Sequence, residues 1–211
     1  MGWSGFYPRS FMAVEGLTRI SHENFGGEAL GSFEGVLDPA ALGKVVDEGG
    51  ERVLADGRHR VVLATFEVAG VRVPVAVKSF GRQGAWKDRA DYKRGTKAAR
   101  SFQAARFLEE NGVGTPRAIA YLERWDGKSL QESYFLSHFV DGLTDVREEL
   151  IKIYRERPEC AHLVSLLKPM SAIIRRMHDA GFWHRDLGNQ NILLTPSQSG
   201  WGELMVIDLN R

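Results

Sequence analysis

The alternation of apolar and polar residues along the middle of the chain predicts a β-sheet. Three segments rich in Val, Leu and Phe fit consecutive strands, at residues 51–55, 59–68 and 71–80. Two dipeptides suited to tight hairpin turns separate them, Asp56-Gly57 and Ala69-Gly70. Two further strands are expected, at 118–125 and 133–140, joined by a turn at Asp126-Gly127. The pattern therefore predicts an antiparallel five-stranded sheet.

A helical period of apolar residues marks the other regular segments. Residues 96–110 form the main helix of the sheet region, with Thr96 as N-cap. After residue 143 the pattern is mostly helical, and it predicts helices at 145–154 and 160–180. Pro169 either kinks the second of these helices or opens it. Two short strands are expected beyond them, at 192–194 and 204–207.

Two segments lack such a period. Residues 1–50 are rich in glycine and predict an extension with little regular structure, apart from one capped helical turn at 38–42. Residues 81–95 are basic and polar and predict a long loop. The expected organisation is an α+β chain of three parts: an N-terminal extension at 1–50, a β-rich lobe at 51–141, and a helical C-terminal lobe at 142–211.

Composition and charge exclude several classes of protein. The 28 basic and 27 acidic residues leave a net charge of +1, which gives no reason to expect a nucleic-acid partner. The single cysteine, Cys160, cannot form an internal disulfide and fits a reducing compartment. No apolar run approaches the ~20 residues of a membrane helix, and the first residues lack the features of a signal peptide. We therefore expect a cytoplasmic protein.

The strongest chemical signal is the octapeptide at 184–191, His-Arg-Asp-Leu-Gly-Asn-Gln-Asn. It matches the H-R-D-L-x-x-x-N catalytic loop of protein-kinase-like phosphotransferases without a gap. A carboxylate at Asp186 can accept the proton of an attacking hydroxyl or orient that hydroxyl. The amide oxygen of Asn191, five residues on, can turn back to hold a magnesium ion on the phosphates.

Three further features occur in the order that a kinase requires. Val75-Ala76-Val77-Lys78 ends a predicted strand and resembles the V-A-I-K pattern, in which the lysine reaches the nucleotide phosphates. The predicted strand 133–140 stands where a kinase hinge would pair with adenine. Asp208 ends another strand, in the place of the magnesium-binding aspartate of D-F-G. Because motif order and predicted context agree, we predict a protein-kinase-like fold.

Four stretches resemble the lipopolysaccharide core kinase family, whose members phosphorylate heptose or Kdo sugars from ATP. They are the helix start at 95–102, the segment 111–123 with the pattern G-x-x-T-P-x-x-x-A-Y-x-E, the segment 177–187, and the terminal Ile-Asp-Leu-Asn-Arg. The resemblance covers residues 50–211. It implies an ATP- and Mg²⁺-dependent kinase of a sugar hydroxyl, acting at the cytoplasmic face of the inner membrane. The basic cluster from Arg82 to Arg100 fits either a solvated loop or peripheral contact with anionic lipid.

The resemblance also implies roles for individual residues. Asp186 would be the catalytic carboxylate, and Asn191 and Asp208 would hold magnesium. The residues implied in ATP binding are Lys78 at the phosphates, Gly57 in the hairpin above them, and Ala76, Val140 and Leu193 in the adenine slot. His184 and Arg185 are expected to orient the loop.

The chain departs from the kinase pattern in three respects. No G-x-G-x-x-G precedes Lys78; the corresponding hairpin has only Gly57, and Arg58 either contributes to the phosphate site or faces solvent. The position expected for the lysine-pairing glutamate falls near Ser101. The sequence also ends three residues after Asp208, which indicates either a fragment of a longer protein or a truncated form with a shrunken lower lobe. In either case we expect the chain to be poorly stable and weakly active alone.

Two alternative functions remain open from the sequence. The same fold would serve a small-molecule kinase or a protein Ser/Thr kinase, because the acceptor is not encoded in the catalytic motifs. A truncated pseudokinase or binding module is favoured by the missing glutamate and opposed by the intact Lys78, Asp186, Asn191 and Asp208.

Overall fold

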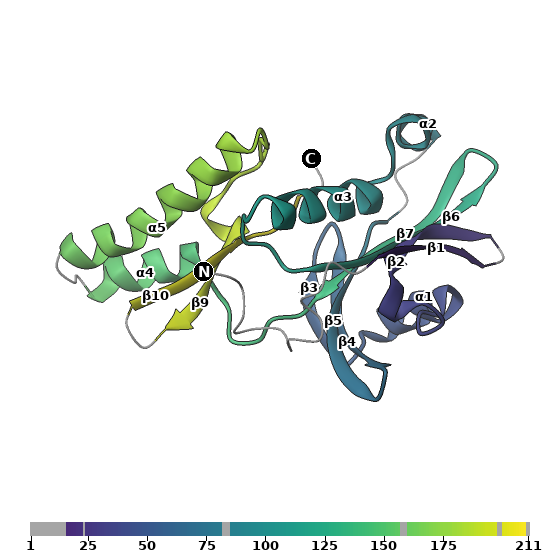
Figure 1. The fold of residues 1–211 in the computed structure, drawn as a ribbon, viewed down its shortest axis with the longest axis horizontal. Helices are drawn as coiled ribbons and strands as arrows, with labels where there is room; N and C mark the ends of the chain where they lie inside the picture. The colour runs from purple at the N-terminus through teal and green to yellow at the C-terminus, as the bar shows by residue number, and fades with distance from the viewer. Residues whose placement is uncertain (1–15, 23, 82–84, 157–159, 198–199, 210–211) are drawn as a thin grey trace. The chain divides into compact units, whose positions relative to one another are not determined.

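The computed structural model describes residues 16–22, 24–81, 85–156, 160–197 and 200–209. The first fifteen residues, Arg82 of the basic cluster and the last two residues of the terminal motif lie outside this part. The chain divides into two compact units: unit 1 comprises Met1–Phe102 and Ala118–Val140, and unit 2 comprises Gln103–Arg117 and Asp141–Arg211. Figure 1 shows the helices and strands of both units with their labels.

Unit 1 is built on an antiparallel sheet in the order β1-β2-β6-β7-β5-β4-β3. The five strands predicted from alternation are present: β3 (Arg52–Asp56), β4 (Arg60–Val68), β5 (Val71–Ser79), β6 (Ala118–Asp126) and β7 (Ser129–His138). Both predicted hairpin turns join these strands as expected. At the β4–β5 turn, Ala69 and Gly70 adopt φ values of 50° and 78°, the left-handed pair that a tight two-residue hairpin requires.

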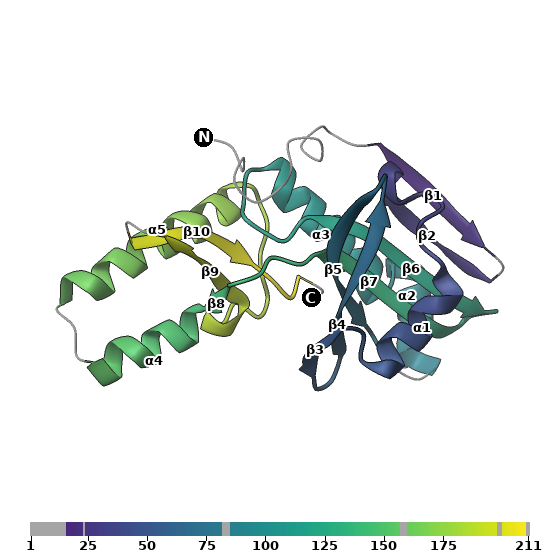
Figure 2. The ribbon, with the colours of Figure 1, turned by 90° about the horizontal axis from the view of Figure 1, so that it is seen from below.

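The prediction of five strands was wrong, because the sheet has seven. The two added strands are β1 (Leu17–His22) and β2 (Phe25–Leu30), which form a hairpin in the region predicted to have little regular structure. β2 pairs with β6, whereas β1 pairs, among the described strands, only with β2 and lies at the edge of the sheet (Figure 2). The glycine-rich sequence of β2 has a weak strand propensity of its own. β2 forms because it pairs with the regular strand β6, and this long-range pairing is not visible in the local sequence.

The N-terminal region also supplies much of the core of unit 1. The predicted helical turn extends to a full helix, α1 (Pro39–Glu48), after a 3₁₀ turn at Gly31–Phe33. Asp38 caps α1 as expected, and its carboxylate accepts hydrogen bonds from the backbone N–H groups of Ala40 and Ala41. One cluster joins the side chains of this region to those of the sheet: Phe25, Ala29, Leu30, Phe33, Leu37, Leu42 and Val46 with Val62, Val75, Val77, Ile119 and Leu136.

The pleat of β5 separates its buried residues from its candidate site residues. Val73, Val75 and Val77 are at most 2% exposed and belong to the core cluster. Because successive side chains point to opposite faces, Ala76 and Lys78 share the other face of the sheet. The same hydrophobic alternation that fills the core therefore also directs these two residues away from it.

The prediction of a loop at 81–95 was also wrong, since α2 spans Ala85–Arg94. This segment has many helix-forming residues but no apolar stripe, so periodicity could not detect it. Two contacts of its second half hold it. Asp91 pairs with Arg100 at 3.0 Å, and the Tyr92 ring meets the edge of Trp125 at 5.4 Å between centroids.

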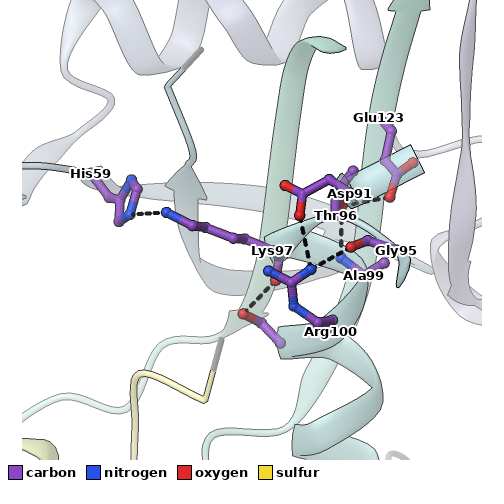
Figure 3. Close-up of polar contacts among 9 residues, drawn as sticks. His59, Asp91, Gly95, Thr96, Lys97, Ala99, Arg100 and Glu123 are labelled. Atoms are coloured by element: carbon purple, nitrogen blue, oxygen red, sulfur yellow. Dashed lines mark hydrogen bonds and ion pairs between the residues drawn. The ribbon is translucent and has the colours of Figure 1, made fainter. Parts of the chain in front are cut away.

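The main helix, α3 (Lys97–Glu110), begins where the sequence predicts. The Thr96 hydroxyl accepts a hydrogen bond from the Ala99 N–H at 3.1 Å and donates one to the Glu123 carboxylate at 2.6 Å (Figure 3). Thr96 is fully buried. The N-cap therefore also fixes the start of α3 against β6.

Unit 2 combines the second half of α3 and two further helices of the described residues with a small sheet (Figure 2). α4 spans Val146–Glu156, and α5 spans Cys160–Asp179 and continues through Pro169. The sheet has the order β10-β9-β8, with β8 at Thr144–Asp145, β9 at Ile192–Ser197 and β10 at Gly200–Val206. The two short strands predicted after the helices are thus present and antiparallel. In the described part of the chain, no helix is long and apolar enough to cross a membrane.

The close approach of β2 to β6 gives a direct test of the N-terminal hairpin. A Cβ added at Gly27 would lie 2.0 Å from the backbone carbonyl oxygen of Tyr121, whereas one added at Gly26 would meet no atom within 4 Å. We expect Gly27→Ala to lower the free energy of unfolding by roughly 1–3 kcal/mol through overpacking. Gly26→Ala is the matched control and should stay within about 0.5 kcal/mol of the wild type. Urea unfolding measures both, and equal midpoints would contradict the pairing of β2 with β6.

Candidate active site

The H-R-D-L-x-x-x-N loop lies between α5 and β9, and one imidazole holds it in place. The backbone N–H of Asp186 donates to Nδ1 of His184 at 3.2 Å, and Nε2 of His184 lies 2.9 Å from the carbonyl oxygen of Ile207. Since Nδ1 accepts, Nε2 must carry the proton and donate to Ile207. His184 therefore joins the backbone of the loop to the strand end just before Asp208, as expected for an orienting residue.

Asn191 closes the loop from its other end. Its side-chain amide donates to the backbone carbonyl of Asp186 at 2.8 Å, which also accepts from the Gly188 N–H at 2.9 Å. Asn191 is buried, and its own backbone carbonyl accepts from the Ile207 N–H at 3.0 Å. The amide NH₂ is thus used by the loop, and the amide oxygen is the atom left for a ligand.

Asp208 follows β10 in a backbone conformation that few side chains adopt. Its φ is +62°, within the left-handed region that is uncommon for residues other than glycine. Asp and Asn tolerate this region better than most residues, and such strain concentrates at functional sites. Unit 2 therefore places Asp186, Asn191 and Asp208 on one hydrogen-bonded framework, with Ile207 in contact with both His184 and Asn191.

The candidate phosphate and adenine residues lie on unit 1, with one exception. Lys78 and Ala76 share a face of the central strand β5, between β4 and β7. The Lys78 ammonium lies 5.3 Å from the centroid of the Phe80 ring, a cation–π contact. Val140 is half-buried just beyond β7, and Leu193, also half-buried, belongs to β9 of unit 2.

Gly57 lies in the turn between β3 and β4, as the sequence predicts. A Cβ at this position would meet no atom within 4 Å, and its φ is outside the left-handed range. The structure of this turn therefore has no steric requirement for glycine at 57. Arg58, the side chain considered for the same turn, is exposed.

The position expected for the lysine-pairing glutamate is occupied by a buried serine. The Ser101 hydroxyl donates to the backbone carbonyl of Lys97 at 2.8 Å and so bonds within its own helix. The two glutamates near the end of α3 have local partners: Glu109 pairs with Arg117 at 3.7 Å, and Glu110 with Arg106 at 3.4 Å. Burial raises the pKa of Glu109 above its usual value, and Arg117 opposes this shift. Neither of these glutamates takes the role that the kinase pattern assigns to the helix acid.

One polar contact near Lys78 was not foreseen from the sequence. Nζ of Lys97 lies 3.4 Å from Nε2 of His59 (Figure 3). His59 follows the β3–β4 turn and Lys97 begins α3, so 38 residues separate the two partners. Patterns among neighbouring residues of the sequence cannot reveal a contact over this separation.

The donor set in unit 2 suits magnesium. Asn191 and Asp208 offer an amide oxygen and a carboxylate oxygen, and Mg²⁺ is typically held by one or two carboxylates together with phosphates and waters. Among the described residues, no group of three or more His, Cys, Asp or Glu side chains is arranged to hold a metal ion. A site of this composition fits a cation that arrives with a phosphorylated ligand.

The antiparallel sheet of unit 1 and the H-R-D loop of unit 2 define a protein-kinase-like α+β fold. The solved kinase domain of PknI from Mycobacterium tuberculosis matches it with a TM-score of 0.50, covering 75% of this chain and 56% of that chain at 16% identity. That likeness concerns the fold alone. A family model for the "Lipopolysaccharide kinase (Kdo/WaaP) family" matches residues 63–211, and the chain belongs to this family.

Individual relatives agree with this assignment. The chain is 34% identical over 118 residues to the lipopolysaccharide core heptose(I) kinase WaaP of Pseudomonas aeruginosa, a match that covers 54% of this chain and 44% of that protein. A solved structure of WaaP in complex with acyl carrier protein has a TM-score of 0.55 and 26% identity, covering 83% of this chain and 70% of that chain. The match to the curated relative thus covers less than half of that relative's length.

The role of His184 can be tested without an activity assay. His184→Ala removes the acceptor of the Asp186 N–H and the donor to Ile207, and a buried partner left unpaired costs about 1–3 kcal/mol. We expect lower stability in urea and faster hydrogen exchange at the Asp186 amide. Asn189→Ala, an exposed position of the same loop, is the control and should change neither. Unaltered exchange at Asp186 in His184→Ala would show that the imidazole does not hold the loop.

Proposed function

We propose that this protein is an ATP- and Mg²⁺-dependent phosphotransferase that phosphorylates a sugar hydroxyl of the lipopolysaccharide core, on heptose or Kdo. The observation that carries the proposal is the hydrogen-bonded framework in unit 2. The side chains of His184 and Asn191 bond to backbone groups of the loop and of Ile207, next to Asp186 and Asp208. Phosphoryl transfer depends mainly on positioning and charge stabilisation, so such a framework is the main requirement.

The residues of the loop would act on the acceptor hydroxyl. Asp186 orients the hydroxyl and accepts its proton as the oxygen attacks the γ-phosphate. The hydrogen bond from Asn191 to the Asp186 carbonyl keeps the backbone of the acid in place during this transfer. The His184 imidazole already has both nitrogens engaged, so it orients the loop and takes no proton.

The residues that the family resemblance implies would hold the nucleotide. Lys78 neutralises charge on the α- and β-phosphates, and Ala76 leaves room for the base above the same face of β5. Val140 and Leu193 line the adenine slot, and the turn at Gly57 covers the phosphates. Asn191 and Asp208 would hold Mg²⁺, which neutralises negative charge on the phosphates when bound.

The identity of the acceptor is the most specific part of the proposal. The family and the named relative favour a sugar of the lipopolysaccharide core, and we propose that the protein acts in the cytoplasm at the inner membrane. The residues of α2 and the start of α3 are rich in Lys and Arg, which would favour an anionic lipid surface or a phosphorylated acceptor.

A binding module without phosphotransfer is the second candidate. The observation that favours it is Ser101, whose hydroxyl bonds within α3 where a kinase would present an acid to the strand lysine. In this case the chain would bind Mg²⁺ and ATP through Lys78, Asn191 and Asp208 without turning ATP over.

Two conservative substitutions test the phosphotransfer chemistry. Asp186→Asn keeps the shape of the loop but removes the base, so phosphate transfer should fall by about 10²–10⁴-fold while the melting temperature stays close to that of the wild type. Asp208→Asn keeps tolerance of the left-handed backbone and should raise the Mg²⁺ concentration needed for half-maximal ATP binding. Asp179→Asn, on the exposed end of α5, is the matched control. Full phosphotransfer by Asp186→Asn would rule out the proposed role of Asp186.

The acceptor class is tested by direct competition. Transfer of the γ-phosphate would be followed with Kdo-lipid A, a heptosylated core acceptor and a generic protein substrate, each with and without acyl carrier protein, which one solved relative holds. We expect transfer to a lipopolysaccharide acceptor and none to protein. Transfer to protein alone would replace the sugar with a Ser/Thr acceptor. ATP binding with no transfer to any acceptor would favour the binding module.

A further inference from the structure

Lys97, the first residue of α3, contacts His59, which lies in the turn between β3 and β4. Nζ of Lys97 lies 3.4 Å from Nε2 of His59, and both side chains are half-buried (Figure 3). The two residues belong to unit 1, as do β5 and its lysine. The contact therefore links the β3–β4 hairpin to the helix within one compact unit.

Aromatic contacts connect this pair to Lys78. The His59 ring meets the Phe80 ring edge-on, with 4.8 Å between centroids. The Lys78 ammonium lies 5.3 Å from the centroid of the same Phe80 ring, and Phe80 is buried at 2% exposure. His59 and Lys78 thus both contact the buried Phe80 ring, and Lys97 contacts His59.

The backbone that carries Lys97 is held firmly. Its carbonyl accepts from the Ser101 hydroxyl at 2.8 Å, and the preceding Thr96 is fully buried and bonded to Glu123 at 2.6 Å. Arg100, one turn on, pairs with Asp91 of α2 at 3.0 Å. The origin of the Lys97 side chain is therefore fixed relative to the sheet, which lowers the entropy cost of using its ammonium for binding.

The chemistry of the pair favours exchange with an anion. An ammonium only donates hydrogen bonds, so Nε2 of His59 must be the unprotonated acceptor. At 3.4 Å this is a long hydrogen bond to an uncharged partner. A bond between an ammonium and a phosphate oxygen joins opposite charges and is typically about 2.7–2.9 Å long. A phosphate within reach would therefore draw the ammonium away from the imidazole.

We propose that Lys97 is a second phosphate-binding lysine of the nucleotide site, which His59 holds in place until a nucleoside triphosphate binds. The inference rests on the proposed function, because it places the phosphates beneath the β3–β4 hairpin and beside Lys78. Lys97 then contacts the phosphate chain beyond the α-phosphate, and His59, released from Lys97, stays against Phe80. Lys97 therefore distinguishes a nucleoside triphosphate from a monophosphate. It does so from α3, the helix that has Ser101 where the kinase pattern has a glutamate.

The test compares the equilibrium binding of adenosine, AMP, ADP and ATP, with Mg²⁺, by the full chain and its variants. Lys97→Met should weaken ATP binding about 10-fold or more, the loss expected for a hydrogen bond between charged partners, and leave AMP and adenosine binding unchanged. Lys97→Arg, which keeps the charge, should restore part of the preference for ATP. Lys44→Met is the control, because Lys44 lies on α1 and pairs with Glu48 at the surface.

His59 is tested through its acceptor atom. His59→Gln keeps a hydrogen-bond acceptor on a side chain of similar reach and should retain most of the preference for ATP over AMP. His59→Ala removes the acceptor and should reduce that preference less than Lys97→Met does, because the lysine remains present. An equal loss of ATP and AMP binding in both His59 variants would mean that the histidine only supports the fold.

Each outcome separates this inference from the function on which it rests. ATP binding by Lys97→Met equal to that of the wild type overturns the inference while leaving the kinase assignment in place. Parallel loss of ATP and AMP binding in Lys97→Met, with a lowered melting temperature, also overturns it. If the wild-type chain and the Lys44→Met control bind none of the four ligands, the proposed function itself fails and the inference falls with it.

Discussion

The hydrogen bonds of the His184 imidazole are the constraint on which the framework of the candidate site depends. One nitrogen accepts from the Asp186 N–H and the other donates to the Ile207 carbonyl, so one neutral ring joins the loop to the end of β10. The Ile207 N–H in turn donates to the Asn191 carbonyl. Together these bonds fix the backbone at Asp186, at Asn191 and at Ile207, the residue before Asp208. The framework of the candidate site is therefore pre-organised, which the proposed phosphoryl transfer would require.

The strand end that carries Asp208 is fixed from several sides. The Val206 N–H donates to the Gly114 carbonyl at 2.8 Å, and β10 pairs with β9, where Val206 lies opposite Ile192. The left-handed backbone of Asp208 immediately follows. Such a conformation persists only where neighbouring structure enforces it, and the paired strand provides that enforcement. The strain at Asp208 and the regularity of β10 are thus parts of one arrangement.

In unit 1 the two faces of the sheet separate the core from the candidate ligand-binding residues. The valines of β5 pack into a core that the N-terminal region completes with Phe33, Leu42 and Val46. The opposite face presents Ala76 and Lys78, and the cluster of His59, Phe80 and Lys97 lies close to that lysine. The N-terminal region thus stabilises the sheet from the face that carries no candidate ligand-binding residue.

Much of the fold and of the candidate site could be predicted from the sequence alone, because the patterns that indicate them are local. Five strands, the cap and stripe of α3, and the order of Lys78, Asp186, Asn191 and Asp208 all follow from periodicity, turn chemistry and motif spacing within short windows. Long-range contacts decided the rest. The β1–β2 hairpin needs β6 as a template, α2 lacks an apolar stripe and is held by Arg100 and Trp125, and the His59–Lys97 contact joins residues 38 apart. These features depend on which surfaces meet after folding, and no local pattern of residues encodes that.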